Sequence, residues 1–266
     1  MNFSNIKLIV SDMDGTLLND NHEVSNRFFN QFERLKQQNI HFIAASGRQM
    51  QSIQTKLHPI LKDISIIAEN GSIITHQNKT EVLLELTQND MVKAIRSLRQ
   101  VDNCYPVLCG KTTAYVENDE PEFISKISEY YTEFTIVDDL SAVSQDAFLK
   151  IAAYHFESSE KYIYPKVEHL NDHLQVVVSG ANWVDISHPE ANKGYALKRL
   201  QENLGVTKAQ TLVFGDYNND LDMLKLADYS FAMGNAHPKV KATANYMTKT
   251  NTEQGVEHIL EQIISS

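Results

Sequence analysis

The sequence contains no apolar run that approaches the ~20 residues of a membrane span. Its first residues also lack the basic and apolar regions of a secretion signal. We therefore expect a cytoplasmic protein that has no membrane partner.

Basic charge is scarce as well, because 24 Lys and Arg face 34 Asp and Glu, for a formal net charge of −10. Proteins that bind nucleic acid regardless of its sequence need basic patches that displace counterions, so we expect no nucleic-acid partner. The overall charge also repels an anionic substrate. Such a substrate has to be attracted by local groups, such as a metal ion, a lysine or a helix amino terminus.

Cysteine is nearly absent, with only Cys104 and Cys109 in the chain. A disulfide or redox pair is one interpretation. Cytosolic proteins rarely keep structural disulfides, so we expect reduced, unreactive thiols. No internal repeat or low-complexity tract is visible, and 266 residues suffice for one large or two medium domains.

What stands out is an apolar run, Ile6–Val10, that leads into Ser11-Asp12-Met13-Asp14-Gly15-Thr16-Leu17. A short apolar run bounded by turn residues is typical of a buried parallel strand, whose carboxyl end lies where open α/β sheets bind ligands. Two carboxylates placed there disfavour each other's ionisation, which a metal ion or a shared catalytic proton would offset. The alternative is that Asp14-Gly15 merely reverses the chain.

Strands and helices alternate at both ends of the chain but not in its middle. Strands are expected at 41–45, 65–68, 211–214 and 229–232, with helices at 24–38, 49–57, 193–203, 221–227 and 253–264. This alternation predicts a doubly wound, Rossmann-like parallel α/β sheet. We expect residues 1–82 and 190–266 to form this core, because each flank alone has too few strands for a stable sheet.

The middle of the chain, residues 83–189, is expected to be an α+β domain inserted into the core, and is called the insertion below. Strands are predicted at 105–109, 113–117, 134–137, 148–156, 175–179 and 183–186, with helices at 90–100, 121–131 and 159–170. We expect antiparallel pairs, with the helices gathered on one face. About 105 residues is an ordinary domain size.

Two further acids, Asp216 and Asp220, follow the strand predicted at 211–214. If the chain changes sides of the sheet between this strand and the first, these acids meet Asp12 at the switch-point crevice. Carboxylate oxygens and waters suit Mg2+. The alternative is that Asp216 only caps the helix that follows it.

Ser46 ends the second predicted strand, and Gly47 allows a close approach of the backbone. A hydroxyl beside the N–H groups of a helix start can hold a phosphate, although Ser-Gly also forms a simple turn. Lys193 opens a predicted helix, where its charge opposes the helix macrodipole. That placement is easier to understand if the lysine meets an anion there.

Taken in order, four stretches resemble the four motifs of the haloacid dehalogenase superfamily of phosphatases. They are Asp12-Met13-Asp14-Gly15-Thr16-Leu17, Ser46-Gly47, Lys193-Gly194 and Gly215-Asp216-Tyr217-Asn218-Asn219-Asp220. The insertion, Glu69-Asn70-Gly71 and the stretch Tyr229–Ala236 resemble subclass IIB, the Cof-type phosphatases, and most of all its sugar-phosphate phosphatases. By this resemblance the insertion is a cap that closes over the sheet edge and sets specificity.

The resemblance implies a role for each residue. Asp12 is the nucleophile that forms an aspartyl-phosphate, and Asp14 is the general acid and base, for which we predict a raised pKa. Ser46 and Lys193 hold the transferring phosphoryl group. Substrate contacts are implied or expected for Gly47, Arg48 and Asn219, and Mg2+ ligation for Asp12, Asp14, Asp216 and Asp220.

The expected substrate is a small phosphorylated metabolite, a sugar phosphate by the resemblance. Within the insertion Tyr115, His155, Trp183 and His188 are candidates for substrate contact, although each is also an ordinary core or surface residue. Two alternatives remain: a phosphotransferase or phosphomutase of the same superfamily, and a non-catalytic phospho-aspartate switch. The sequence says nothing of the oligomeric state.

Overall fold

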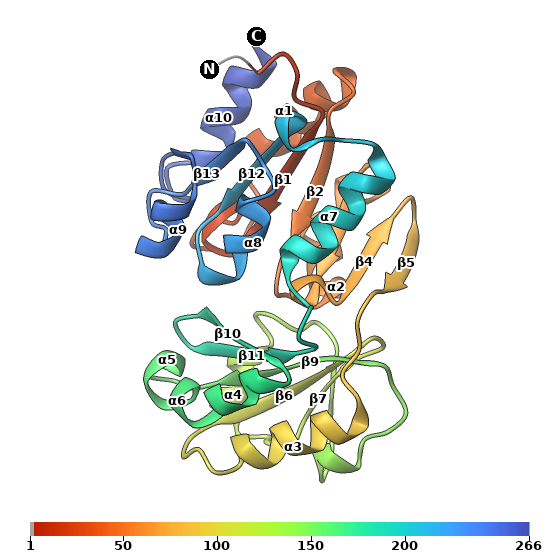
Figure 1. Ribbon diagram of the computed structural model, residues 1–266, viewed down its shortest axis with the longest axis vertical. Helices are drawn as coiled ribbons and strands as arrows, with labels where there is room; N and C mark the ends of the chain where they lie inside the picture. Colours follow the sequence, from red (N-terminus) through yellow and green to blue (C-terminus); the bar gives the residue numbers. More distant parts are fainter. Residues whose placement is uncertain (1–2, 266) are drawn as a thin grey trace.

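The computed structural model describes residues 3–265 and contains two β-sheets, one above the other (Figure 1). The first sheet has eight strands in the order β14-β13-β12-β1-β2-β3-β4-β5. Their bounds are β1 Leu8–Asp12, β2 His41–Ala45, β3 Ser65–Ala68, β4 Ile73–His76, β5 Lys79–Val82, β12 Thr211–Gly215, β13 Tyr229–Ala232 and β14 Tyr246–Met247. The first six in this order are mutually parallel, and β4 and β5 continue the sheet as an antiparallel hairpin.

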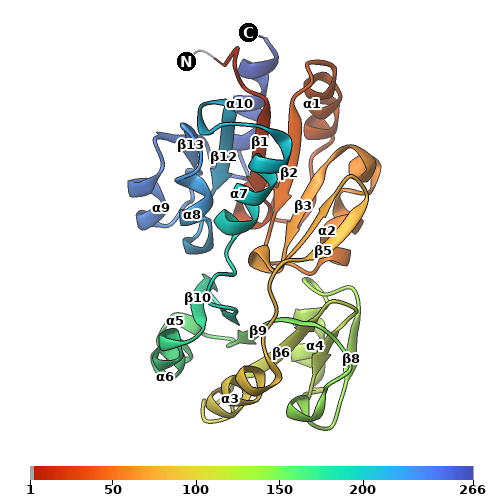
Figure 2. The ribbon, with the colours of Figure 1, turned by 45° about the vertical axis from the view of Figure 1, so that its right-hand side comes forward.

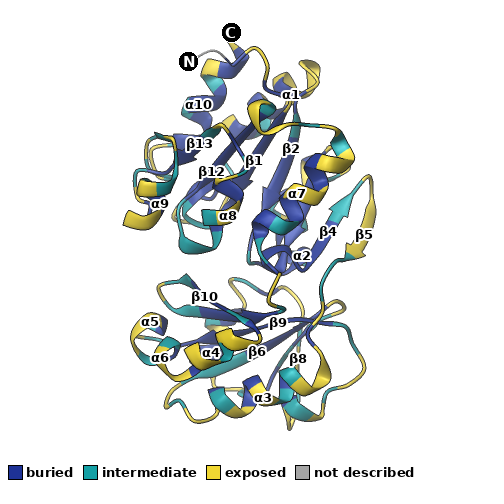
Figure 3. Ribbon diagram, in the orientation of Figure 1, coloured by how far each residue is buried: buried dark blue, intermediate teal, exposed yellow. Residues whose placement is uncertain are grey.

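The central strands of this sheet are buried along their whole length because helices cover both faces (Figure 3). The main helices are α1 Asn26–Gln37, α2 Met50–Lys56, α7 Lys193–Leu204, α8 Leu221–Leu224, α9 Pro238–Thr243 and α10 Gly255–Ile264. Helix α7 packs against α8 on one face, and α1 packs against α10 on the other (Figures 1 and 2). This doubly wound α/β arrangement confirms the predicted fold class.

The direction of winding reverses between β1 and β12, which are paired in parallel. From β1 the chain winds through β2 to β3, and from β12 it winds the opposite way through β13 to β14. A crevice therefore opens at the carboxyl ends of β1 and β12, where such sheets bind ligands. Asp12 is the last residue of β1 and Asp216 directly follows β12.

The second sheet comes entirely from residues 105–187, between the two parts of the chain that build the first. Its order is β10-β11-β9-β6-β7-β8, and its neighbours are antiparallel except β7 and β8. The bounds are β6 Tyr105–Gly110, β7 Ala114–Val116, β8 Phe134–Ile136, β9 Phe148–Tyr154, β10 Gln175–Gly180 and β11 Trp183–Ser187. The helices of this part are α3 Gln88–Leu98, α4 Pro121–Ile127, α5 Ser159–Tyr162 and α6 Tyr164–Val167.

The helices of the insertion do not share one face, contrary to our prediction. Met91 of α3 and Ile163, which joins α5 to α6, belong to one apolar core with Ile151 of β9. Phe123 of α4 belongs to a separate core with Ala152. Because successive side chains of a strand point to opposite faces, β9 supplies a core on each side.

Our prediction of one continuous helix over 159–170 is also wrong. The structure divides this stretch into α5, α6 and a 3-10 helix over Glu168–Asp172. Pro165 explains the break, because it has no N–H to continue the hydrogen bonds of α5 and instead occupies the first turn of α6. Within residues 3–265, no helix has both the length and the apolarity to cross a membrane.

Candidate active site

Three carboxylates meet at the carboxyl ends of β1 and β12. Asp12, Asp216 and Asp220 each offer an oxygen, and these oxygens all lie within 4.8 Å of one another. The turn after β1 leaves room for them only because residue 15 is glycine. A Cβ on Gly15 would lie 2.2 Å from Asp216 Oδ2, and its φ of +71° is one that other residues rarely adopt.

Lys193 is the cation inside this cluster. Its side chain is fully buried, and Nζ lies 2.5 Å from Asp12 Oδ1 and 2.6 Å from Asp220 Oδ1. The other oxygen of Asp220 accepts hydrogen bonds from the backbone N–H groups of Asp216 and Tyr217. Asp220 is therefore occupied in holding Lys193 and the loop, whereas Asp12 and Asp216 are better placed to take a metal ion.

One lysine does not balance three clustered acids, of which Asp12 and Asp220 are buried and Asp216 is half-buried. Burial and the charge of Asp220 raise the pKa of Asp12 to about 7, against the opposing effect of Lys193. Burial and the charge of Asp12 also raise the pKa of Asp216 well above its ordinary value. A surplus of buried carboxylate oxygens without enough positive charge is the donor set that a hard divalent cation such as Mg2+ prefers. The residues present thus fit the expected metal.

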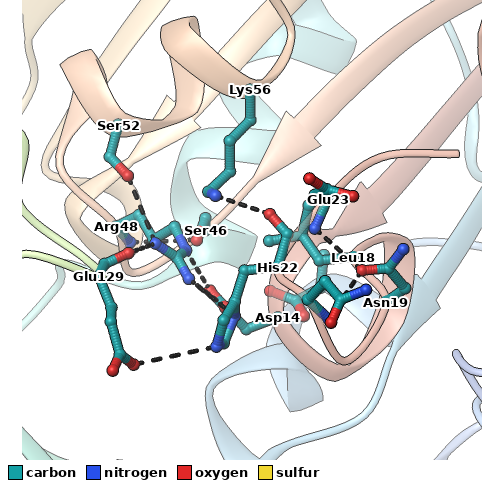
Figure 4. A network of polar contacts seen from close by, with 12 residues as sticks. Asp14, Leu18, Asn19, His22, Glu23, Ser46, Arg48, Ser52, Lys56 and Glu129 are labelled. Carbon is teal, nitrogen blue, oxygen red and sulfur yellow. Dashed lines mark hydrogen bonds and ion pairs between the residues drawn. The ribbon is translucent and has the colours of Figure 1, made fainter. Parts of the chain in front are cut away.

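Asp14 behaves differently from Asp12, although only one residue separates them. Arg48 donates two hydrogen bonds to the Asp14 carboxylate, from Nε to Oδ2 at 2.7 Å and from Nη2 to Oδ1 at 2.6 Å (Figure 4). His22 Nδ1 lies 3.6 Å from Asp14 Oδ1. Burial acts to raise the pKa of Asp14, but the bonds from His22 and Arg48 outweigh it, so the pKa lies below its ordinary value. Our prediction of a raised pKa is therefore wrong for this state. It considered the neighbouring acid but not Arg48.

Arg48 also connects the two parts of the molecule. Its side chain is 1% exposed, Nη1 donates to the carbonyl oxygen of Glu129 at 2.5 Å, and its guanidinium lies 4.6 Å from the centre of the Tyr130 ring. Glu129 and Tyr130 belong to the insertion. The guanidinium is thus engaged with Asp14 and the insertion, and its contact with substrate stays a prediction.

Ser46 and Gly47 follow β2 and line the same crevice. The Ser46 hydroxyl oxygen accepts from the backbone N–H of Arg48 at 3.1 Å, so its own proton can be donated to a ligand. Asn219 Nδ2 donates to Asn70 Oδ1 at 3.0 Å, and Asn219 also lines the crevice. The structure therefore brings together the site residues predicted in the core, at the carboxyl ends of β1, β2 and β12.

A cleft of about 340 Å³ lies over these residues, with walls from both parts of the molecule. The core contributes Asp12, Asp14, Ser46, Arg48, Asp216 and Asn219, and the insertion contributes Tyr130, Tyr131, Lys150, Asn182, Trp183 and Asp185. This volume is in the range of small-molecule sites.

Of the four candidates named in the insertion, Trp183 alone lines the cleft. Tyr115 donates its hydroxyl proton to Asp146, and the His155 ring stacks on Tyr162. His188 Nδ1 accepts from the backbone N–H of Glu190. These three side chains therefore have ordinary structural partners. The two cysteines are free, as expected, and burial raises the pKa of Cys104 to about 12.

The sequence interpretation missed three buried charges beside the cleft, those of Glu69, Lys150 and Asp185. Their side chains are 1%, 2% and 5% exposed. A signal was available, because Lys150 is the single charged residue in the apolar strand Phe148–Tyr154 and Asp185 is the single charge in Trp183–Ser187. A lone charge in a buried strand needs a partner or a function.

Comparison with known proteins agrees with this geometry. The model of the haloacid dehalogenase-like hydrolase family matches residues 9–260. A 5-amino-6-(5-phospho-D-ribitylamino)uracil phosphatase of Escherichia coli is 31% identical, with 97% of this chain and 96% of the relative covered. A Bacillus subtilis phosphatase named for the same compound is 30% identical, over 94% of this chain and 93% of the relative.

Among solved structures, a Streptococcus mutans protein superposes with a TM-score of 0.91 at 27% identity, covering 98% of this chain and all of the other. The matches extend over the insertion as well as the sheet. The relatives from Escherichia coli and Bacillus subtilis are both named as phosphatases. The chain therefore belongs to the haloacid dehalogenase-like hydrolase family, and it is a phosphatase that acts on phosphate monoesters.

Proposed function

We propose that this phosphatase is Mg2+-dependent, hydrolyses small sugar or sugar-alcohol phosphates, and works through an aspartyl-phosphate on Asp12. The observation that supports this most is the joint position of Asp12, Lys193 and Asp216 at the floor of a cleft that both parts of the molecule enclose. On this proposal residues 1–82 and 190–266 are the catalytic core, and the insertion is the cap.

The carboxylates of Asp12 and Asp216 and the backbone carbonyl of Asp14 would hold Mg2+, while Asp220 keeps Lys193 in place. When bound, Mg2+ supplies positive charge for the phosphoryl oxygens, which carry the spread negative charge of the transition state. Lys193, the Ser46 hydroxyl and the Gly47 N–H would add to that charge stabilisation.

Asp12 attacks phosphorus, so that a bond forms from its carboxylate oxygen to phosphorus while the bond to the leaving alcohol breaks. Asp14 gives a proton to that alcohol. In the second step Asp14 removes a proton from a water molecule whose oxygen bonds to phosphorus. The bond from Asp12 to phosphorus breaks, so that phosphate is released and the Asp12 carboxylate is restored.

In this structure Asp14 is an ionised carboxylate, because Arg48 and His22 stabilise its charge. The second step requires this ionised form. For the first step it must carry a proton. A bound phosphate dianion places negative charge beside Asp14, which favours the protonated form. The substrate thus promotes the protonation that its own cleavage needs.

The wall that the insertion contributes to the cleft favours a particular leaving group. Tyr130 and Trp183 lie with ring centres 5.4 Å apart, and Tyr131 lies near the same indole, so the insertion presents an aromatic wall. Such a wall suits a leaving group that ends in a flat ring. We therefore put 5-amino-6-(5-phospho-D-ribitylamino)uracil, the compound for which two relatives are named, beside the simple sugar phosphates as a candidate substrate.

The test is phosphate release from a panel of sugar phosphates, nucleotides, this ribitylaminouracil phosphate and p-nitrophenyl phosphate. Wild type with Mg2+ is compared with wild type in EDTA and with Asp12→Asn. We expect release that requires Mg2+ and vanishes in Asp12→Asn. Durable phosphorylation of Asp12 without turnover would favour the switch, and transfer of phosphate to a sugar would favour the phosphotransferase.

A further inference from the structure

Lys150 lies on the face of the second sheet that is turned toward the catalytic core. It occupies β9, the strand between β6 and β11, and its side chain is 2% exposed. Nζ donates to the carbonyl oxygen of Gly47 at 2.5 Å and lies 3.1 Å from Glu69 Oε2 and 3.3 Å from Asp185 Oδ2. Gly47 and Asp185 accept hydrogen bonds from this ammonium, and Glu69 faces it as an ion pair without a hydrogen bond. Two of these partners belong to the core.

The core residues that meet Lys150 also support the loop that holds phosphate. The backbone N–H of Glu69 donates to the carbonyl of Arg48, and that of Asn70 donates to the carbonyl of Ser46, each at 3.1 Å. Glu69 and Asn70 both have positive φ, +50° and +54°, which L-residues adopt at a cost. This strained backbone thus occurs in the segment whose hydrogen bonds and ion pair connect the 46–48 loop to the insertion.

Asn70 extends these contacts to the acid loop. Its Nδ2 donates to Asp185 of the insertion, and its Oδ1 accepts from Asn219. A continuous path of hydrogen bonds and ion pairs thus runs from Lys150 and Asp185 to both loops that carry site residues. In the described part of the chain, Lys150 is the cation at the centre of that path.

We propose that Lys150 is a positioning residue, which links closure of the insertion to the conformation of the phosphate-binding loop 46–48. When the insertion moves away from the core, Lys150 leaves Gly47 and Glu69, and the loop loses the bond that fixes its central carbonyl. When the insertion closes, that carbonyl is held, and the positions of the Ser46 hydroxyl and the Gly47 N–H on either side of the loop's first peptide bond are fixed with it. This inference rests on the proposed function, because the loop is assigned to phosphate through it.

A merely structural role for Lys150 makes a different prediction. Lys150 lies between two buried acids, so Lys150→Met would leave Glu69 and Asp185 without a counter-charge and would lower stability for that reason alone. The double variant Lys150→Met with Glu69→Gln removes one negative and one positive charge together. It restores the charge balance but not the bond to the Gly47 carbonyl, so it separates the two roles.

The experiment measures kcat, KM and the inhibition constant of inorganic phosphate with p-nitrophenyl phosphate as substrate. It compares wild type, Lys150→Met, the double variant, and Lys166→Met, an exposed lysine of α6 as a matched control. We expect phosphate inhibition to weaken about tenfold or more in both Lys150 variants, the loss usual for one charge-assisted hydrogen bond, with no change in Lys166→Met. The proposal is overturned if the double variant binds phosphate like wild type, since Lys150 then acts only as a counter-charge.

A second readout needs no turnover. Trp183 is the only tryptophan of the chain and lines the cleft from the insertion, so its emission reports on closure. Titration with inorganic phosphate and Mg2+ should shift the emission of wild type and of Lys166→Met, and this shift should be lost in the double variant. If wild type shows the shift but hydrolyses nothing, the proposed function fails while the inference stands. An equal shift in wild type and the double variant overturns the inference.

Discussion

At the scale of single residues, Asp12 and Asp14 show how neighbouring carboxylates acquire opposite properties. Asp12 is enclosed with two other acids, and burial raises its pKa to about 7. Asp14 is held by Arg48 and His22, so its pKa is lowered although burial opposes this. Environment rather than residue type separates them, and such a separation is what distinct catalytic roles require.

Asp14→Asn tests the role of that carboxylate. The amide can neither give a proton to the leaving alcohol nor take one from water, so we expect turnover to fall about 10²–10⁴-fold. Binding of Mg2+ and inorganic phosphate should stay close to wild type, as measured by calorimetry. Turnover near the wild-type rate would show that another group moves the proton.

Arg48→Met tests the cause of the low pKa of Asp14. Without the guanidinium that pKa rises, so Asp14, the base that we propose for hydrolysis of the aspartyl-phosphate, becomes protonated at a higher pH. The acid limb of the kcat profile should therefore move to higher pH, by one unit or more if the bonds are worth about 1.4 kcal/mol or more. Arg34→Met, on the exposed side of α1, is the control. An unmoved acid limb would contradict the assignment.

At the scale of elements, the site depends on turns that follow strands. The turn after β1 brings Gly15 against Asp216, and the turn after β12 uses Asp220 to hold its own backbone N–H groups. Gly15 thus leaves space for Asp216 beside the turn after β1, and Asp220 holds the turn that carries Asp216. The parallel pairing of β1 with β12 sets the two turns side by side.

Gly15→Ala should damage the site more than the fold. Its Cβ would collide with Asp216 Oδ2 and the alanine would have to adopt a positive φ, so we expect at least a tenfold loss of kcat/KM and a higher Mg2+ requirement. Gly205→Ala is a matched control, because Gly205 ends α7 with φ +63° and nothing lies within 4 Å of its Cβ position. That variant should lose about 1 kcal/mol of stability and keep its activity. Mg2+ titrations and thermal melts measure both.

At the scale of the whole molecule, buried acids make stability depend on pH and, on the proposed function, on Mg2+. Asp12 has a pKa of about 7 in the folded chain against an ordinary value of 3.8, so between these values the folded state binds more protons than the unfolded state. The contribution of Asp12 to stability is therefore greatest at low pH and declines as pH rises from about 4 to 7. A bound cation favours the ionised form and opposes this decline.

We therefore expect Mg2+ to raise the melting temperature more at pH 7.5 than at pH 5, by several degrees. Calorimetric melts of wild type and Asp12→Asn, each with Mg2+ and with EDTA, measure this. The variant lacks the titrating group, so its response to Mg2+ should be smaller and less dependent on pH. An equal Mg2+ effect at both pH values in wild type would be inconsistent with a metal held by Asp12.

Local sequence by itself determined the parallel sheet, its helices and the order in which the site residues occur. A short apolar run such as Leu8–Val10 that turn residues bound is typical of a strand in a sheet covered on both faces. Residues that directly follow parallel strands then lie at one edge of the sheet. The fold class was predictable for these reasons, and the family was identified by the resemblance of the four motifs. Asp12, Ser46 and Asp216 were predictable as neighbours by the same argument.

Tertiary structure alone decided which partners these residues take. The pairing of Arg48 with Asp14, the meeting of Lys150 with Gly47 and the division of the insertion's helices between two faces join residues far apart in the chain. No local pattern carries such pairings, because burial and charge compensation are properties of the assembled interior. For the same reason the pKa of Asp14 could not be deduced from Asp12 beside it, since the groups that control it come from elsewhere in the chain.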